Sequence, residues 1–115
     1  MKPNETYKFP EYTFLTEVRT AGYGGVGLLI KNEITYKQLV LPTINPIEAI
    51  AVITTNTHPQ LLIFSIYIPP STTNSNQLKD PFNKLFQIIE NQDKPTILAG
   101  DFNAHYQLWN PSHPN

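Results

Sequence analysis

The residues best suited to chemistry in this sequence stand together as Gly-Asp-Phe-Asn-Ala-His at positions 100–105. They follow the apolar stretch 95–100, which predicts a short buried strand. Ligands of layered α/β proteins bind at the carboxyl ends of strands, where a glycine lets the backbone approach a ligand closely. Asp101 offers a hard oxygen ligand or a base, and Asn103 offers an amide that can donate to a phosphate oxygen. Asp and Asn without cysteine suit a hard cation such as Mg²⁺. Enzymes with such a site usually act on phosphates.

Spacing alone leaves a structural interpretation of this motif open, because Asp and Asn also shape turns at strand ends. Tyr67 lies at the end of the apolar run 61–68, where Ile68 and two prolines follow it, and could offer its hydroxyl to a phosphate. The alternative is a structural role, in which Tyr67 is an aromatic residue at the edge of the core and the following prolines end the strand. Glu48 is the one charge in the apolar stretch 47–55. A buried carboxylate needs a partner, so Glu48 lies on a wet face or pairs with a site residue.

Other features do not match known phosphate-binding loops, catalytic triads or histidine metal sites. The glycines at 24–27 resemble a phosphate loop, but no Lys-Ser/Thr follows, and they precede a strand instead of a helix. We expect a turn there that needs small residues for close packing. His58 and His113 lie in proline-flanked loops, and the sequence has no Ser-His-Asp arrangement or His pair at metal-ligand spacing.

The elements that must position these residues are short, because 11 prolines divide the chain. The periodicity predicts a helix over 81–91, with Asp80 as its N-cap, Pro81 at its first position and apolar side chains at i, i+3, i+4 and i+7. A two-residue turn at 32–33 predicts a hairpin between its flanking strands. Residues 1–11 are expected to be irregular, and strands are expected at 12–16, 26–31, 34–41, 47–55, 61–68 and 95–100.

The order strand, helix, strand from 61 to 100 predicts a parallel crossover within a mixed sheet. The stretches 47–55 and 61–68 are expected side by side at the centre of that sheet, with Ile53, Phe64 and Ile66 nearly fully buried. Tyr67, Asp101 and Asn103 are then expected to meet at one edge of the sheet, because parallel strands end on the same side.

Composition limits the class of protein. The chain has 115 residues, 40% of them hydrophobic, which suffices for one small domain and is too apolar for a disordered tail. With no cysteine, a disulfide framework and a thiolate metal site are excluded. Eight basic residues against nine acidic ones give no general positive field for nucleic acid. Without a long apolar run or a signal core, we expect no membrane partner and an intracellular location.

Together, these motifs resemble the endonuclease/exonuclease/phosphatase superfamily. Their order is most similar to the apurinic-type endonuclease domain of non-LTR retrotransposons, whose polyproteins also carry a reverse transcriptase. The matching stretches are residues 24–30, 47–50, 65–70 and 100–105, followed by Trp109.

The resemblance implies an α/β fold, as part of a four-layer sandwich of two mixed sheets with outer helices. It implies phosphodiester hydrolysis with Mg²⁺ or Mn²⁺, no small-molecule cofactor, and DNA as partner. Target DNA would be nicked in the nucleus to prime reverse transcription. Asp101 resembles the aspartate that activates the attacking water and is a candidate metal ligand. Asn103 resembles the asparagine that orients water and phosphate, and Tyr67 the tyrosine near the phosphate. His105 does not match the catalytic histidine.

The pattern also departs from the family. The metal-binding glutamate would precede residue 1, and a second Asn or Asp ligand and a Ser-Asp-His element are not matched. Residues 1–115 therefore resemble a partial domain, for which we expect little nuclease activity in isolation. The alternatives are an inactive remnant or interaction fragment of the same fold, or a phosphomonoesterase of the same superfamily.

Overall fold

The computed structural model describes residues 6–8, 10–17, 25–69 and 76–102. These residues form seven strands and one helix arranged around two sheets. In chain order the elements are β1 (Thr6–Lys8), β2 (Tyr12–Glu17), β3 (Val26–Lys31), β4 (Tyr36–Leu39), β5 (Glu48–Thr54), β6 (Leu62–Tyr67), α1 (Asn76–Gln92) and β7 (Thr96–Asp101).

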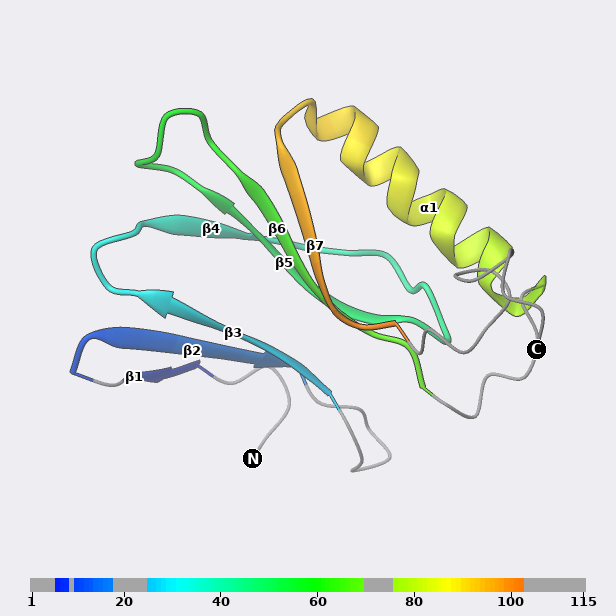
Figure 1. Ribbon diagram of the computed structural model, residues 1–115, viewed down its shortest axis with the longest axis horizontal. Helices are drawn as coiled ribbons and strands as arrows, with labels where there is room; N and C mark the ends of the chain where they lie inside the picture. Colours follow the sequence, from blue (N-terminus) through cyan, green and yellow to red (C-terminus); the bar gives the residue numbers. More distant parts are fainter. Residues whose placement is uncertain (1–5, 9, 18–24, 70–75, 103–115) are drawn as a thin grey trace, which may run out of the picture.

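The described residues build three layers, as Figure 1 shows: α1, a four-stranded sheet, and a three-stranded sheet. The three-stranded sheet has the order β1-β2-β3 and is antiparallel. The four-stranded sheet has the order β4-β5-β6-β7 and is mixed, because only β6 and β7 run parallel. The α/β class is therefore confirmed, while the fourth layer of the expected sandwich stays a prediction.

The two central strands, β5 and β6, are neighbours in the sheet as predicted. Ile53, Phe64 and Ile66 are 8%, 0% and 1% exposed, which confirms their expected burial. Both faces of these strands are covered. One face packs against Leu78, Phe82 and Leu85 of α1, and the other meets Leu15 of the three-stranded sheet through Ile50 and Val52.

The helix differs from the prediction at its start. α1 begins at Asn76, so Asp80 is not its N-cap and Pro81 lies inside it. Leu78 accounts for the extra turn, because it lies four residues before Phe82 and extends the apolar face by one position. Its side chain is 0% exposed in the core under the helix. The helix is thus lengthened by burial that its capping pattern did not indicate.

The predicted hairpin between the third and fourth strands is wrong. The turn itself is present, with the Ile34 N–H donating to the Lys31 carbonyl, but β4 pairs with β5 and belongs to the other sheet. Asn56 in the β5–β6 loop holds the chain there. Its side-chain amide donates to the Glu33 carbonyl at 2.8 Å, and its Oδ1 accepts from the Thr35 N–H at 3.0 Å. Tertiary contacts therefore redirect a locally correct turn.

Two findings concern the three-stranded sheet. β1 lies within the segment expected to be irregular, since pairing with β2 stabilises a strand of only three residues. The expected close packing at the glycine-rich segment is confirmed at Gly27, where an added Cβ would lie 2.7 Å from a ring carbon of Phe14.

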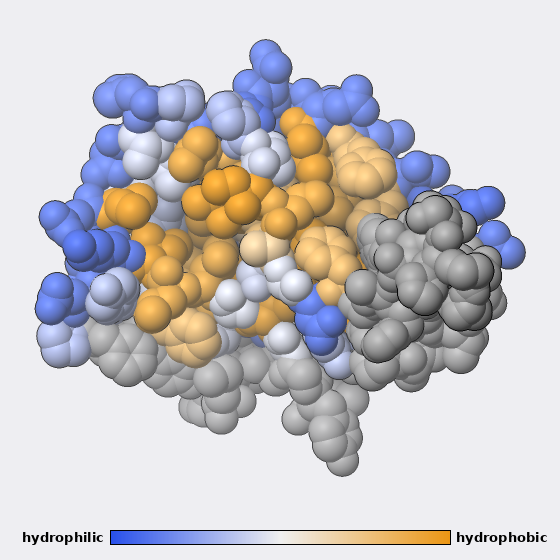
Figure 2. All heavy atoms as spheres, viewed as in Figure 1, coloured by the Kyte–Doolittle hydropathy of each residue, from blue (hydrophilic) through white to orange (hydrophobic). Residues whose placement is uncertain are grey.

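Apolar residues also reach the surface. Figure 2 shows them gathered across the middle of the viewed face, over the strands between α1 and the three-stranded sheet. The three-stranded sheet lies against β5 and β6, and Ile97 on the edge strand β7 is 47% exposed. No helix among the described residues is long and apolar enough to cross a membrane.

Candidate active site

Glu48, Tyr67 and Asp101 form a row across three neighbouring strands. Tyr67 is the register partner of Glu48 on the antiparallel strand β5 and of Asp101 on the parallel strand β7. In Figure 1 the start of β5 and the ends of β6 and β7 lie at the same end of the sheet. Side chains of register partners point to the same face, so the three residues share one face. We call them the acidic row.

The acidic row faces away from α1. Ile50 and Val52 follow Glu48 at two-residue intervals on β5, and both pack toward the three-stranded sheet. Ile66 and Ile68, the chain neighbours of Tyr67, are buried in the helix-side core instead. Because side chains alternate along a strand, Tyr67 lies on the opposite face from that core. The row therefore lies at the end of the interface between the two sheets.

The backbone at Asp101 is held on both sides. The N–H of Ile68 donates to the Asp101 carbonyl at 2.9 Å, which extends the β6–β7 ladder to the end of β7. Phe102 is half-buried and packs against the helix-side core. The Asp101 side chain itself is exposed. A fixed backbone thus presents this carboxylate to solvent at the strand end.

Gly100 packs against the backbone of the neighbouring strand. Its φ is +146°, a region that side-chain-bearing residues rarely adopt, and an added Cβ would lie 1.8 Å from the carbonyl oxygen of Ile66. The close approach that this glycine permits in the structure is to the backbone of β6. Gly100 acts on the site by letting β7 reach the register that places Asp101 beside Tyr67.

The two other members of the row are less exposed. Tyr67 is half-buried, and both carboxylate oxygens of Glu48 are inaccessible to solvent. The wet-face interpretation of Glu48 is wrong for that reason. Its alternative, a role beside the site residues, agrees with its register next to Tyr67.

Sequence reasoning missed Glu17, a further carboxylate at this end of the molecule. Glu17 ends β2 and is the register partner of Val26, which packs toward the interface between the sheets. Glu17 is an exposed residue, but partial desolvation of its carboxylate raises its pKa above the ordinary value of 4.5, because desolvation disfavours the charged form. The alternation Thr13, Leu15, Glu17 along the strand could have indicated that Glu17 shares the face of the buried Leu15.

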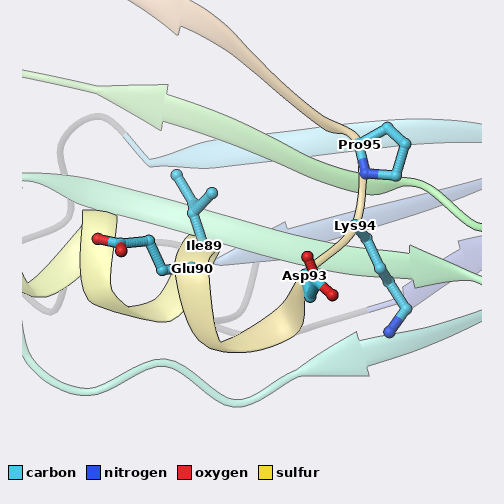
Figure 3. Close-up of a pocket in the computed structure, with 5 residues that line it drawn as sticks. All are labelled: Ile89, Glu90, Asp93, Lys94 and Pro95. Atoms are coloured by element: carbon cyan, nitrogen blue, oxygen red, sulfur yellow. The ribbon is translucent and has the colours of Figure 1, made fainter.

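Asn103, His105 and Trp109 lie outside the described residues, as do Pro70 and His113. Among the described residues, no group of three or more acidic or histidine side chains could hold a metal ion. A surface hollow is found elsewhere, lined by Ile89, Glu90, Asp93, Lys94 and Pro95 (Figure 3). It lies where α1 connects to the start of β7, the opposite end of that strand from Asp101, and takes no part in the acidic row.

Comparison with known proteins agrees with the placement of the motifs. Residues 61–115 match a family model described as endonuclease-reverse transcriptase. The matched segment begins just before β6 and includes Tyr67 and Asp101. It supports an endonuclease/exonuclease/phosphatase-like family, with an endonuclease-like domain in a reverse-transcriptase context. No curated protein and no solved structure matches the chain.

Proposed function

We propose that this chain carries part of the site of a metal-dependent DNA endonuclease, which hydrolyses a phosphodiester bond. The observation that supports this most directly is the register of Tyr67 and Asp101, side by side at the carboxyl ends of two parallel strands. A phenol and a carboxylate in that position can contact a phosphate and a water together. The family model over residues 61–115 points to the same class of reaction.

In this proposal each residue contributes to the binding of the phosphate or of the attacking water. The Tyr67 hydroxyl hydrogen-bonds to an oxygen of the scissile phosphate, and the Asp101 carboxylate orients the attacking water and accepts its proton. Asn103, assigned from its motif, donates its amide hydrogens to the phosphate. The half-buried position of Tyr67 restricts its ring, which favours one orientation of the bound phosphate.

The residues present suit a hard cation in part. Asp101 is an exposed residue that offers a carboxylate, and Mg²⁺ is commonly held by one or two carboxylates together with substrate phosphate and water. When bound, Mg²⁺ or Mn²⁺ would neutralise charge that develops on the phosphate. Asp101 is the described residue that we assign to hold it.

We propose further that the substrate is chromosomal target DNA, nicked in the nucleus. The cut would leave a 3′ hydroxyl that a reverse transcriptase, in the same polyprotein, extends. The context named by the family model supports this part of the proposal.

A second candidate is an inactive fragment of the same fold that binds but does not cleave. The observation that favours it is the lack of a group of three metal-ligating side chains in the described part of the chain. On this basis we expect residues 1–115 alone to show little nicking, because removing members of one catalytic unit costs orders of magnitude.

A plasmid-nicking assay with Mg²⁺ tests both candidates. Residues 1–115 and the longest polypeptide of the same reading frame are compared, each with Asp101→Ala and with Asp80→Ala as control. Asp80 is an exposed aspartate on α1, away from the acidic row. We expect nicking by the longer polypeptide, its loss in Asp101→Ala, and no loss in Asp80→Ala. An equally active Asp101→Ala protein would overturn the role of Asp101, and an inactive longer polypeptide would favour the second candidate.

A further inference from the structure

The outer edge of β7 lacks the features that normally keep an edge strand from pairing with other chains. β4 and β7 are the two edge strands of the four-stranded sheet. β4 carries the exposed Lys37, a residue type that protects natural sheet edges, whereas β7 has no lysine or proline. The sequence predicts burial of the apolar stretch 95–100, yet Ile97 is 47% exposed. An apolar, unprotected edge of this kind is a template for a further strand.

The backbone of β7 presents hydrogen-bonding groups on its outer side. The N–H of Ile68 donates to the Asp101 carbonyl at 2.9 Å, so the backbone groups of Asp101 point toward β6. These groups alternate in direction along a strand, so those of Thr96, Leu98 and Gly100 point away from β6. No strand in the described part of the chain pairs with this side of β7.

We propose that the outer edge of β7 pairs with the same edge of a second copy of this chain, in antiparallel orientation. The two four-stranded sheets then form one continuous sheet, with a two-fold axis that passes through the pair of Leu98 residues. Thr96 of each copy lies opposite Gly100 of the other, and these pairs exchange backbone hydrogen bonds. The inference does not rest on the proposed function.

The side chains fit each other in this register. Ile97 lies opposite Ala99 of the second copy, in a pair without backbone hydrogen bonds, where side chains approach most closely. A large apolar side chain thus meets a small one, and both are exposed in the single chain. Ile63, the register partner of Ile97 on β6, packs toward the three-stranded sheet. Pairing therefore covers apolar surface on the face of β7 that lies away from α1.

Charge favours this register over its neighbours. Asp101 of one copy reaches the start of β7 in the other, where Lys94 precedes the strand. A shift of one residue would bring opposite faces of the strands together, so the competing registers differ by two residues. One of them places Asp101 opposite the apolar Ile97, and the other brings it to Asp93, a like charge. The strand is thus complementary to itself in size and charge, which identifies a second copy as the occupant.

Disulfide trapping tests this pairing directly, because the sequence contains no cysteine. Ile97→Cys and Ala99→Cys are introduced in separate proteins, since both positions are exposed. On air oxidation, a mixture of the two should form the disulfide-linked heterodimer several times faster than either variant links to itself, because residue 97 faces residue 99. Val40→Cys measures random collision, since Val40 is 93% exposed and lies outside the strands. A mixture no faster than Val40→Cys would overturn the proposal, as would faster linkage of either variant to itself.

Hydrogen exchange tests the same pairing in the unmodified residues 1–115. The outward amides of Thr96, Leu98 and Gly100 should become more protected as the protein concentration rises, because a second copy binds them by mass action. The Ala99 amide points toward β6 and should show no such dependence. Protection of the outward amides that does not depend on concentration would show that another segment of the same chain covers the edge, and would overturn the proposal.

A charge on the edge should separate the two copies. Ala99→Lys, at an exposed position of β7, should raise the dissociation constant of the dimer by at least about tenfold in sedimentation experiments. The control is Val40→Lys, which adds the same charge outside the strands and should leave the dissociation constant unchanged. An equal effect of both substitutions would contradict pairing through β7.

Discussion

At the scale of single residues, the position of Asp101 depends on a neighbour that has no side chain. Gly100 lies against the backbone of Ile66, and Asp101 follows it in register with Tyr67. The contact involves backbone atoms, so a change of rotamer cannot relieve a clash there. A residue that does no chemistry therefore determines whether the chemical groups can meet.

We expect Gly100→Ala to destabilise the fold by more than about 2 kcal/mol, since it combines a positive φ with a steric clash. Urea unfolding measures the change. Ala99→Gly, on the same strand, is the control and should cost less than about 1 kcal/mol. A Gly100→Ala protein that unfolds like the original would contradict the close approach between β6 and β7.

Glu17 links stability to pH. Its pKa is raised by desolvation in the native state. At pH values between the ordinary and the raised pKa, the native state therefore holds a proton that the unfolded state has lost. The associated stability is present below the ordinary value of 4.5 and is lost as the pH rises through the raised pKa. Glu17→Gln removes this loss. We expect the variant to melt at a higher temperature than the original at neutral pH, with the difference vanishing under acidic conditions.

Thermal melts across this pH range check the Glu17 prediction. Glu33→Gln provides the control, because the Glu33 side chain is 78% exposed and pairs with Lys31 at 3.3 Å on the surface. It should not gain stability at neutral pH. A Glu17→Gln protein that is less stable than the original at neutral pH would show that its carboxylate is stabilised by contacts instead of penalised by burial.

At the scale of elements, α1 illustrates how burial extends a helix beyond its capping signals. Leu78 lies before the start indicated by Asp80 and Pro81, yet it is completely buried. Leu78, Phe82 and Leu85 together cover the helix-side face of β5 and β6. The helix therefore belongs to the support of the strands that carry the acidic row.

We expect Leu78→Ala to cost about 2–5 kcal/mol, because it leaves a cavity in the core under the helix. Phe86→Ala is the control on the same helix. Phe86 is 47% exposed and stacks on Phe82 at a centroid distance of 5.8 Å, so its loss should be smaller. Denaturant unfolding of both variants measures the difference. A negligible cost at Leu78 would instead favour a helix that begins near Pro81.

At the scale of the whole molecule, the two sheets do not cover each other completely. Ile97 on β7 is 47% exposed, and apolar residues reach the surface across the face shown in Figure 2. Contiguous apolar surface of this kind promotes association. The site and this surface lie on the same sheet, since Ile97 and Asp101 both belong to β7.

We expect Ile97→Thr to reduce self-association of residues 1–115 at high concentration without a large loss of stability. Analytical ultracentrifugation or light scattering over a concentration series measures it. Val40→Thr is the matched control, because Val40 is 93% exposed but lies outside the strands. An equal effect of both substitutions would show that general hydrophobicity, and not the exposed face of β7, drives association.

The sequence predicted those features that depend on interactions between residues close together in the chain. Alternation and apolar runs indicated β5 and β6 as adjacent central strands, because two-sided burial leaves a continuous apolar pattern. The crossover through a helix made β6 and β7 parallel, so Tyr67 and Asp101 were expected at one end, where they lie. These features depend on local periodicity and on chain connectivity, both of which can be read directly from residue order.

Only the tertiary structure decided which strands pair and which surfaces pack against each other. A correct turn at 32–33 leads β4 to the other sheet, because Asn56, far along the chain, offers hydrogen bonds there. The desolvation at Glu17, the buried oxygens of Glu48 and the clash that reserves position 100 for glycine likewise come from segments distant in sequence. A residue pattern encodes which face is apolar, but the choice of which surface covers that face is settled only when all elements compete for burial together.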